Sequence, residues 1–573
     1  MNNLQHHVSK ASAGSFWASC ALLSVCYAQV SAQTAPDAGS LLNQIQRSFP
    51  PPRLPDVGPP APPLKIEIIE PKGPTVTVKA FGFLGNLLIP AEQLAPLLAK
   101  YVGRPLSFED LRNAAAEISL YYRRQGYVAT VSVPKQEVSD GIVLFRVLES
   151  RFGGVTLDVA SDGRINPELL RQIILHAMQP GAPTDMRQLD RGLLLAGDLP
   201  GAAVTGGLAA GTEEGRSDLV LLSRRTPTWS GSATADNAGA RSTGEARGLA
   251  SLALASPLGK GEQFSADALK SDGALYGRFG LGFPVGYEGS RVSVGVSRMD
   301  YDLVADEFLA ARLSGQATTW SADYVRPVTR SRVFNVNFTA GFEDKSFRNE
   351  AAGAIASDYG IRSFSAGFNG NLYDDLFGGG VTTAQAVWSV GELDLAGSPN
   401  QAAVAASTRA EGRFQKLRFA LARTQNVAQD LVLAVSLNGQ LASKNLDSAE
   451  KLFAGGVGSV RAYPINEGSG DAGYIASAEA RWQCAPRWQA IAFVDHARMR
   501  VNADNAIAGA AVNNDLSYEG AGLGLSWQGP LDSVWRATWS RRIGDNPNPR
   551  VDGTDQDGSL RADRFWFSVA LNF

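Results

Sequence analysis

From Thr226 to the C-terminal Phe573, apolar and polar residues alternate in segments separated by Gly, Asp, Asn and Ser. A period of two turns successive side chains to opposite faces of a strand. Segments of about ten such residues are typical of transmembrane β-barrels, which turn one face to lipid and the other to the lumen. These 348 residues, at roughly 20 residues per strand and connection, predict about 16 antiparallel strands. The last strand shows the alternation most clearly and ends the chain, with apolar residues at Phe565, Phe567, Val569, Leu571 and Phe573.

The chain before Thr226 has a helical period instead, and it predicts two similar α/β units, 64–150 and 151–225. In the first unit we expect helices over 90–101 and from Ser107, followed by strands over 127–133 and 142–148. The second helix has an apolar face and a capping-box pattern at its start. In the second unit, helices are expected over 166–178 and 185–196, between strands. One β-α-α-β-β plan therefore occurs twice.

The N-terminus predicts two further segments. Residues 1–32 have the pattern of a secretory signal peptide, with small residues before a cleavage between Ala32 and Gln33. A membrane anchor, or a lipoprotein signal at Cys26, is the alternative. Residues 33–63 combine a short amphipathic helix, 38–49, with a proline-rich tether from Pro50 to Pro63. The helix is either a frayed terminus or a mobile element that docks elsewhere.

Composition and charge exclude several classes of function. The net charge of −3 gives no reason to expect a nucleic-acid partner. Apart from the signal, Cys484 is the only cysteine, so we expect no internal disulfide. His176 and His496 lack a neighbouring nucleophile, and no Cys/His cluster suggests a metal. We therefore expect no catalytic residue, cofactor or metal. Beyond the signal, no segment offers 18 uninterrupted apolar residues, so any membrane crossing must use strands.

Several short motifs, in this order and spacing, resemble the TpsB outer-membrane transporters of two-partner (type V) secretion, the FhaC/ShlB/HecB type of haemolysin secretion/activation protein. They are Phe83–Asn86, Tyr101–Ser107 and Tyr121–Val128 in the first unit, Leu199–Gly201 in the second, and Asp236–Gly239 at the barrel entry. The resemblance covers nearly the whole mature chain. It implies two periplasmic POTRA (polypeptide-transport-associated) domains, POTRA 1 at 64–150 and POTRA 2 at 151–225. It also implies an outer-membrane barrel at 226–573 and a plug helix at 38–49.

The most specific motifs lie in the barrel. Val460-Arg461-Ala462-Tyr463 resembles the VRGY tip of a long loop that folds into the barrel, and Phe493-Val494-Asp495 resembles the F-x-D motif of an inner strand. The resemblance implies that Arg461 pairs with Asp495; without it, the two are unrelated surface charges. Ala462 and Ala497 stand where the family has Gly. A solvated pair of this kind is worth about 0–1 kcal/mol, so we expect an anchor that breaks easily.

The resemblance also implies that a secreted TpsA-type exoprotein binds the POTRA domains unfolded and leaves through the barrel. Strand addition to a free sheet edge is the expected mode. In POTRA 1 the expected client groove is bordered by six residues: Leu111, Ile118, Tyr122, Tyr127, Val128 and Val131. Further expected partners are outer-membrane lipid and the barrel-assembly machinery, with the chain as a monomer. The alternatives are a barrel-assembly factor of the same superfamily, a passive channel and a secreted β-rich adhesin.

Overall fold

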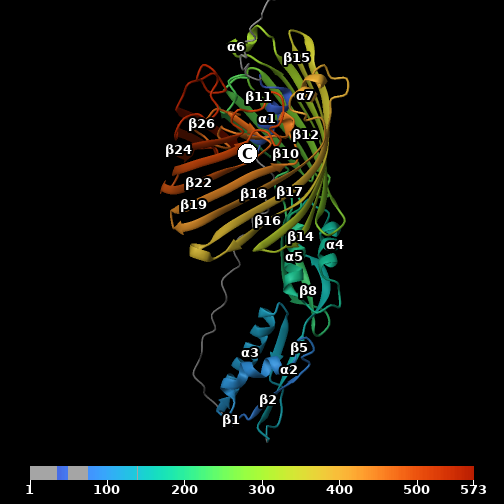
Figure 1. Cartoon of the computed structure of the whole chain (residues 1–573). Helices are drawn as coiled ribbons and strands as arrows, with labels where there is room; N and C mark the ends of the chain where they lie inside the picture. The colour runs from blue at the N-terminus through green and yellow to red at the C-terminus, as the bar shows by residue number, and fades with distance from the viewer. Residues whose placement is uncertain (1–34, 50–74, 139) are drawn as a thin grey trace, which may run out of the picture.

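The computed structural model describes residues 35–49, 75–138 and 140–573. Within these residues, sixteen antiparallel strands form one closed barrel, which confirms the predicted fold and strand number (Figure 1). The strands follow one another around the wall in chain order. They are β9 (Trp229–Asp236), β10 (Arg247–Ala255), β11 (Gln263–Lys270), β12 (Ala274–Val285), β13 (Ser290–Asp302), β14 (Ser314–Arg330), β15 (Phe334–Ala351), β16 (Ala354–Asp374), β17 (Gly380–Asp394), β18 (Gly412–Ala428), β19 (Leu431–Ala442), β22 (Ala472–Ala485), β23 (Trp488–Arg500), β24 (Asp515–Gln528), β25 (Val534–Arg542) and β26 (Asp563–Asn572).

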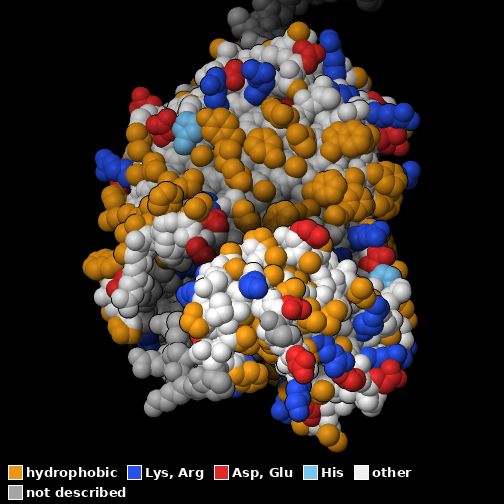
Figure 2. Space-filling view, turned by 90° about the horizontal axis from the view of Figure 1, so that it is seen from below, with side chains coloured by type: hydrophobic (Ala, Val, Ile, Leu, Met, Phe, Trp, Pro, Cys, Tyr) orange, Lys and Arg blue, Asp and Glu red, His pale blue; other side chains and the backbone are white. Residues whose placement is uncertain are grey.

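The outer wall of the barrel is apolar. Side chains such as Trp320, Phe364 and Phe565 are exposed by 62%, 66% and 68%, as expected for a wall that faces lipid rather than water. Figure 2 shows hydrophobic side chains gathered on this wall, whereas the units below it carry a mixture of charged and apolar side chains. Among the described residues, no helix is long and apolar enough to span a membrane.

The barrel closes between its first and last strands. In β9, Ser232 to Asp236 pair with Asn572 to Ser568 of β26. Where β9 ends, the side chain of Asn237 continues the ladder: its amide donates to Phe565 O at 2.9 Å and accepts from Phe567 N at 2.8 Å. The closure thus joins residues that lie 330 positions apart in the chain.

Two α/β units follow each other below the barrel. The first contains β1 (Thr75–Thr77), β2 (Ala80–Leu84), α2 (Ala91–Leu94), η1 (Ala95–Tyr101), β3 (Pro105–Ser107), α3 (Phe108–Arg124), β4 (Ala129–Ser132) and β5 (Ile142–Glu149). The second contains β6 (Arg151–Leu157), α4 (Pro167–Ala177), α5 (Met186–Gly197), β7 (Ala203–Ala210) and β8 (Arg216–Arg224). Their sheets have matching orders, β2-β5-β4 and β6-β8-β7, each with one parallel and one antiparallel pair.

The helices of the first unit show how the sequence sets local structure. Ser107 and Asp110 form the expected capping box at the start of α3, and the hydrogen bonds from the Ser107 backbone N–H and hydroxyl lower the pKa of the Asp110 carboxyl. The helix predicted over 90–101 is instead split into the short α2 and the 3₁₀ helix η1. Pro96 lies in the first turn of η1 and has no N–H for an α-helical bond.

The second unit is fastened to the barrel by ion pairs. Arg330, at the end of β14, donates to both oxygens of Asp198 at 2.7 and 2.8 Å, and its side chain is 4% exposed. Arg332 pairs with Asp190 close by, but this pair is more exposed, 44% and 28%. Arg164 adds bonds to Ala255 O and Thr226 O. The unit is therefore held against the barrel rim at several points.

We expect Arg330→Ala to loosen the second unit, because truncating one partner of a buried interfacial pair costs about 2–5 kcal/mol. Arg332→Ala is the matched control, since an exposed pair contributes about 0–1 kcal/mol. Hydrogen–deuterium exchange of α5 and of the turn at 331–333 should speed up in the first variant and change little in the second. Equal exchange in both variants would contradict the role given to Arg330.

Candidate functional site: the filled lumen

The lumen of the barrel contains a helix from the N-terminal end of the chain. Helix α1 (Ala38–Ser48) lies among the barrel strands, with Asp37 as its capping residue (Figure 1). Its apolar face packs on the inner wall, and Leu41, Leu42 and Ile45 are each at most 4% exposed. The structure thus places the predicted helix 38–49 inside the barrel. The predicted signal peptide, its cleavage point at Ala32 and Gln33, and the tether Pro50–Pro63 lie outside the described residues.

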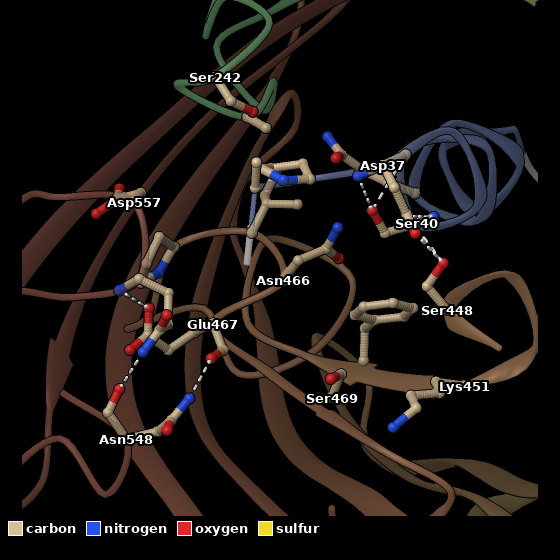
Figure 3. A pocket seen from close by; sticks show the side chains of 18 of the residues that line it. Asp37, Ser40, Ser242, Ser448, Lys451, Asn466, Glu467, Ser469, Asn548 and Asp557 are labelled. Carbon is tan, nitrogen blue, oxygen red and sulfur yellow. Dashed lines mark hydrogen bonds between the residues drawn. The ribbon is translucent and has the colours of Figure 1, made fainter. Parts of the chain in front are cut away.

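A long loop between β19 and β22, residues 443–471, holds the other side of α1. We call it the lumen loop; it contains η3 (Ser448–Glu450) and the paired strands β20 (Leu452–Ala454) and β21 (Gly468–Gly470). Ser448 donates to Asp37 at 2.8 Å, and Asn43 donates to Ala449 O at 3.0 Å. Arg47 donates to Asn466 at 3.1 Å. Figure 3 shows Ser448 directed at Asp37 and Ser40. All three residues line a cavity of about 1730 Å³.

The lumen loop is itself tied to the wall by buried charges. Glu450 is 2% exposed and lies between Lys345 of β15, at 3.0 Å, and Lys416 of β18. Gln440 of β19 donates to Glu450 O at 3.0 Å. A carboxylate shared by two ammonium groups compensates the cost of burying all three. These contacts fix the part of the loop on which α1 rests.

The tip of the lumen loop carries Arg461, which reaches Asp495 of β23. Its guanidinium donates to both carboxylate oxygens, at 2.8 and 2.7 Å, and its backbone N–H donates to the same group at 3.1 Å. Glu479 of β22 accepts a further bond at 2.7 Å, and Ser477 contacts both partners. The structure therefore brings together the two residues that the motifs paired.

The other predicted residues of this site surround the pair. The guanidinium of Arg461 lies 3.4 Å from the ring centroid of Phe493, which is a cation–π contact. Tyr463 stacks edge-on against Tyr518 at 5.1 Å, and Arg542 lies over its ring. Val460 is fully buried in the same cluster. Ala462 and Ala497 are also fully buried, and Ala462 faces Gly520 of β24.

The environment of the pair differs from the sequence-based expectation. Asp495 is fully buried and the Arg461 side chain is 12% exposed, so the pair is not solvated. Its geometry is bidentate and it forms part of a larger network. Removing one member of a buried pair costs about 3–5 kcal/mol, far more than a surface pair does. The expectation that the pair is solvated is therefore wrong.

Two anchors of the tip were not predicted. The carbonyl oxygen of Arg461 accepts from Trp566 Nε1 at 2.8 Å and from the Ser540 hydroxyl at 2.7 Å. Trp566 belongs to β26, where it points inward between outward-facing Phe565 and Phe567. An indole at a lumen-facing position was the available signal, because such positions are ordinarily polar.

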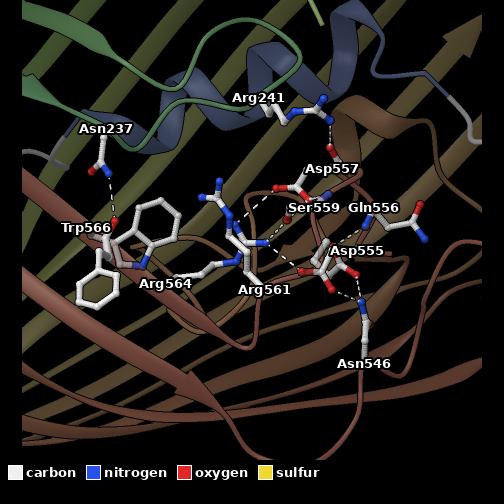
Figure 4. A network of polar contacts seen from close by, with 12 residues as sticks. Asn237, Arg241, Asn546, Asp555, Gln556, Asp557, Ser559, Arg561, Arg564 and Trp566 are labelled. Atoms are coloured by element: carbon white, nitrogen blue, oxygen red, sulfur yellow. Dashed lines mark hydrogen bonds and ion pairs between the residues drawn. The ribbon is translucent and has the colours of Figure 1, made fainter. Parts of the chain in front are cut away.

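A second loop, residues 543–562 between β25 and β26, contacts the lumen loop, and we call it the covering loop. Asp555 accepts from Arg564 and Asn546, at 2.9 and 2.8 Å (Figure 4). It also accepts from Arg542 at 2.5 Å. Gln556 N donates to Glu467 of the lumen loop at 2.8 Å. This network joins the covering loop to both the wall and the lumen loop.

The residues predicted for the client groove are distributed differently from the expectation. Leu111, Ile118 and Tyr122 of α3 are at most 6% exposed and form the core of the first unit, so they do not border a surface groove. The apolar face of α3 covers its own sheet. Tyr127 and Val128 contact the second unit: Val128 N donates to Thr184 O at 3.2 Å, and Tyr127 forms a bridge with Asp185.

Two edges of the first sheet nevertheless carry no further strand in the described part of the chain. One is β4, which contains half-buried Val131 and pairs only with β5. The other is β2, which ends beside Leu84 and Leu87, exposed by 53% and 81%. These two leucines line a hollow of about 480 Å³ that reaches Pro183 of the second unit. The sequence did not indicate this second edge.

No group of three or more His, Cys, Asp or Glu side chains that could hold a metal occurs among the residues described. Glu450 and Asp555 each pair with two Lys or Arg side chains. Their arrangement is that of structural anchors between loops and wall.

Comparisons with known proteins agree with this architecture. A family model described as haemolysin secretion/activation protein ShlB/FhaC/HecB matches residues 215–525, more than half of the chain. A ShlB-type POTRA domain model matches residues 76–150. Heme/hemopexin transporter protein HuxB of Haemophilus influenzae is 23% identical over 449 residues, which are 77% of this chain and 79% of that protein. Outer membrane transporter CdiB of Dickeya dadantii is 24% identical over 73% of this chain and 74% of its own.

Solved structures show the same fold. CdiB from Escherichia coli has a TM-score of 0.67 at 20% identity, covering 89% of this chain and 93% of that one. BamA from Haemophilus ducreyi, lacking its POTRA domains 1–3, has a TM-score of 0.52 at 14% identity. The described strands accordingly form an outer-membrane barrel, with the POTRA region in the periplasm. The chain belongs to the ShlB/FhaC/HecB family of haemolysin secretion/activation proteins, the outer-membrane transporters of two-partner secretion.

Proposed function

We propose that this transporter receives one unfolded exoprotein in the periplasm, passes it through the barrel, and at rest keeps the lumen closed with α1 and the lumen loop. The proposal rests on one observation: both helix α1 and the lumen loop occupy the lumen. Helix α1 is bonded to the lumen loop, and that loop is bonded to the wall through Arg461 and Asp495. A passive channel has no need of these two anchored elements. A barrel-assembly factor has no evident use for a helix seated in the lumen.

The client first pairs with an open edge of the first POTRA unit. We favour β2, because exposed Leu84 and Leu87 offer apolar contacts beside its unpaired backbone groups. Edge β4 is the second candidate, since its four residues start at the junction with the second unit. Both edges are on the side of the barrel from which an unfolded chain would enter.

The remaining parts of the proposal concern partners. The apolar outer wall contacts outer-membrane lipid, the barrel-assembly machinery inserts the barrel, and the chain works as a monomer. No nucleic acid, cofactor or catalytic step is part of the mechanism. Co-expression with a candidate TpsA-type exoprotein tests the function directly: the partner should reach the medium only with the intact transporter. A partner that stays in the periplasm would count against the proposal.

Removing the apolar face of α1 should open the lumen. In the variant Leu41→Ser, Leu42→Ser, Ile45→Ser, each lost side chain had contributed roughly 1.5–3 kcal/mol by its burial. We expect severalfold higher conductance in planar lipid bilayers. Gln46→Ala, on the half-buried face of the same helix, is the matched control. If the triple variant conducts no more than the control, α1 does not close the lumen.

A further inference from the structure

The inner wall beneath α1 carries a continuous row of apolar side chains. Strands β11 to β16 each contribute one inward residue, and each residue is the direct register partner of the next. All are at most 7% exposed in the presence of α1. We call this set the seat row: Leu269, Tyr276, Met299, Ala317, Phe347 and Tyr359.

A seat of this kind is unusual for a pore. Inward positions of outer-membrane barrels are ordinarily polar, because they face water. Here six neighbouring strands place apolar groups at one level, and Phe347 and Tyr359 stack at 5.0 Å. When α1 leaves, these side chains face water, and any apolar chain that covers them is favoured.

Asp37 and Arg47 contact the lumen loop through their side chains, but the contacts of the two ends of α1 with the barrel wall need little of its sequence. Asn349, one row away from Phe347 on β15, accepts the backbone N–H of Ala38 at 2.8 Å. Arg247 of β10 donates to the Ser48 hydroxyl at 2.8 Å. A different segment with an apolar face, a free backbone N–H and a small hydroxyl could satisfy the same groups. The seat therefore recognises a kind of segment rather than α1 alone.

We propose that the seat row is a binding site for an amphipathic segment of the translocating client, and that α1 occupies this site when no client is present. This inference rests on the proposed function. The closed wall keeps membrane lipid away from the row, because lipid cannot reach an inner wall without an open seam. Only a polypeptide that enters the lumen can cover the row.

The matching client segment repeats the pattern of Leu41, Leu42 and Ile45, with apolar residues on one helical face. The client segment then replaces α1 directly at the seat row. The exchange keeps the row covered throughout, so the pore does not pass through a state with a bare apolar wall.

Photocrosslinking tests the site in the full chain during secretion. A benzoyl-phenylalanine at position 347 should form an adduct with the exoprotein, whereas the same group at Phe364, on the outer wall of the neighbouring strand β16, should form none. Adding Tyr276→Ser and Met299→Ser should lower the adduct at least fivefold. Ser365→Ala, a lumen-facing change outside the row, should leave it unchanged.

An adduct at 347 that persists undiminished in the serine variant would overturn the proposal, because the client then passes without binding. So would normal secretion with no adduct at position 347, or at position 276 if the first chain does not insert. Failure of the unmodified chain to secrete the exoprotein would instead contradict the proposed function.

A second measurement needs no client. In bilayers, the barrel lacking residues 38–48 should be closed reversibly by a synthetic peptide of residues 36–49. Its Leu41→Ser, Leu42→Ser, Ile45→Ser version should not close it. Closure by both peptides, or by neither, would show that the row does not select an apolar face.

Discussion

Replacing Arg461 by Ala should reduce export of the exoprotein at least tenfold while the barrel remains inserted. The change leaves Asp495, fully buried, without a cation and beside Glu479. An uncompensated buried carboxylate costs about 3–5 kcal/mol, enough to displace the tip of the lumen loop. Secretion into the medium and heat-modifiable migration of the folded barrel measure the two effects separately.

The matched control for this change is Arg481→Ala. Arg481 also pairs with Glu479, but it is 39% exposed and has no bond to Asp495. Its loss should change export little. Arg461→Lys should recover only part of the export, because an ammonium group cannot form the bidentate hydrogen bonds that the guanidinium makes to the carboxylate. Full export by Arg461→Ala would show that transport does not need the anchored tip.

Gly520→Ala should impair export through the same loop, and Ala462→Gly in the same chain should restore it. A methyl group at position 520 would lie 2.5 Å from the Cβ of Ala462, which is fully buried. Overpacking of this kind typically costs about 1–3 kcal/mol, and it would push on the residue next to Arg461. Because the two methyl groups compete for one space, removing either should relieve the clash.

Gly524→Ala on the same strand is the matched control. Its added methyl group would meet Thr538 and Ile491 at 3.4 and 3.5 Å, which are ordinary contacts. Export should stay near the level of the unmodified chain. If the double variant Ala462→Gly, Gly520→Ala exports no better than Gly520→Ala, the defect does not arise from this contact. The pair also shows how this chain accommodates Ala at position 462, because Gly520 leaves room for its methyl group.

The barrel was predictable because alternation is a local property of each strand. Lipid outside and a lumen inside impose it on every strand, so sixteen strands could be estimated before their partners were known. Helix α1 was predictable from the spacing of Leu41, Leu42 and Ile45 for the same reason. Its place in the lumen came from the family resemblance alone.

The errors have a common physical cause. Asp495 is bonded to Arg461, and Arg461 is held by Glu479, Phe493 and Trp566, which come from three different strands. No local sequence pattern predicts that these side chains come together. The apolar face of α3 was assigned to a client, although an amphipathic helix in a small α/β unit covers its own sheet first. Similarly, the contacts of Tyr127 and Val128 with the second unit depend on how the two units meet.

The closure between β9 and β26 has a consequence for how the barrel forms. In every other neighbouring pair of the wall, the second strand is the next wall strand along the chain. The pair of β9 and β26 instead joins residues 330 positions apart. Bringing such distant ends together costs about 5 kcal/mol of chain entropy, and β26 follows every other strand of the wall in the chain. Until β26 pairs with it, β9 has an unpaired edge that invites aggregation. This one pairing therefore turns an open sheet into a cylinder and removes the exposed edge.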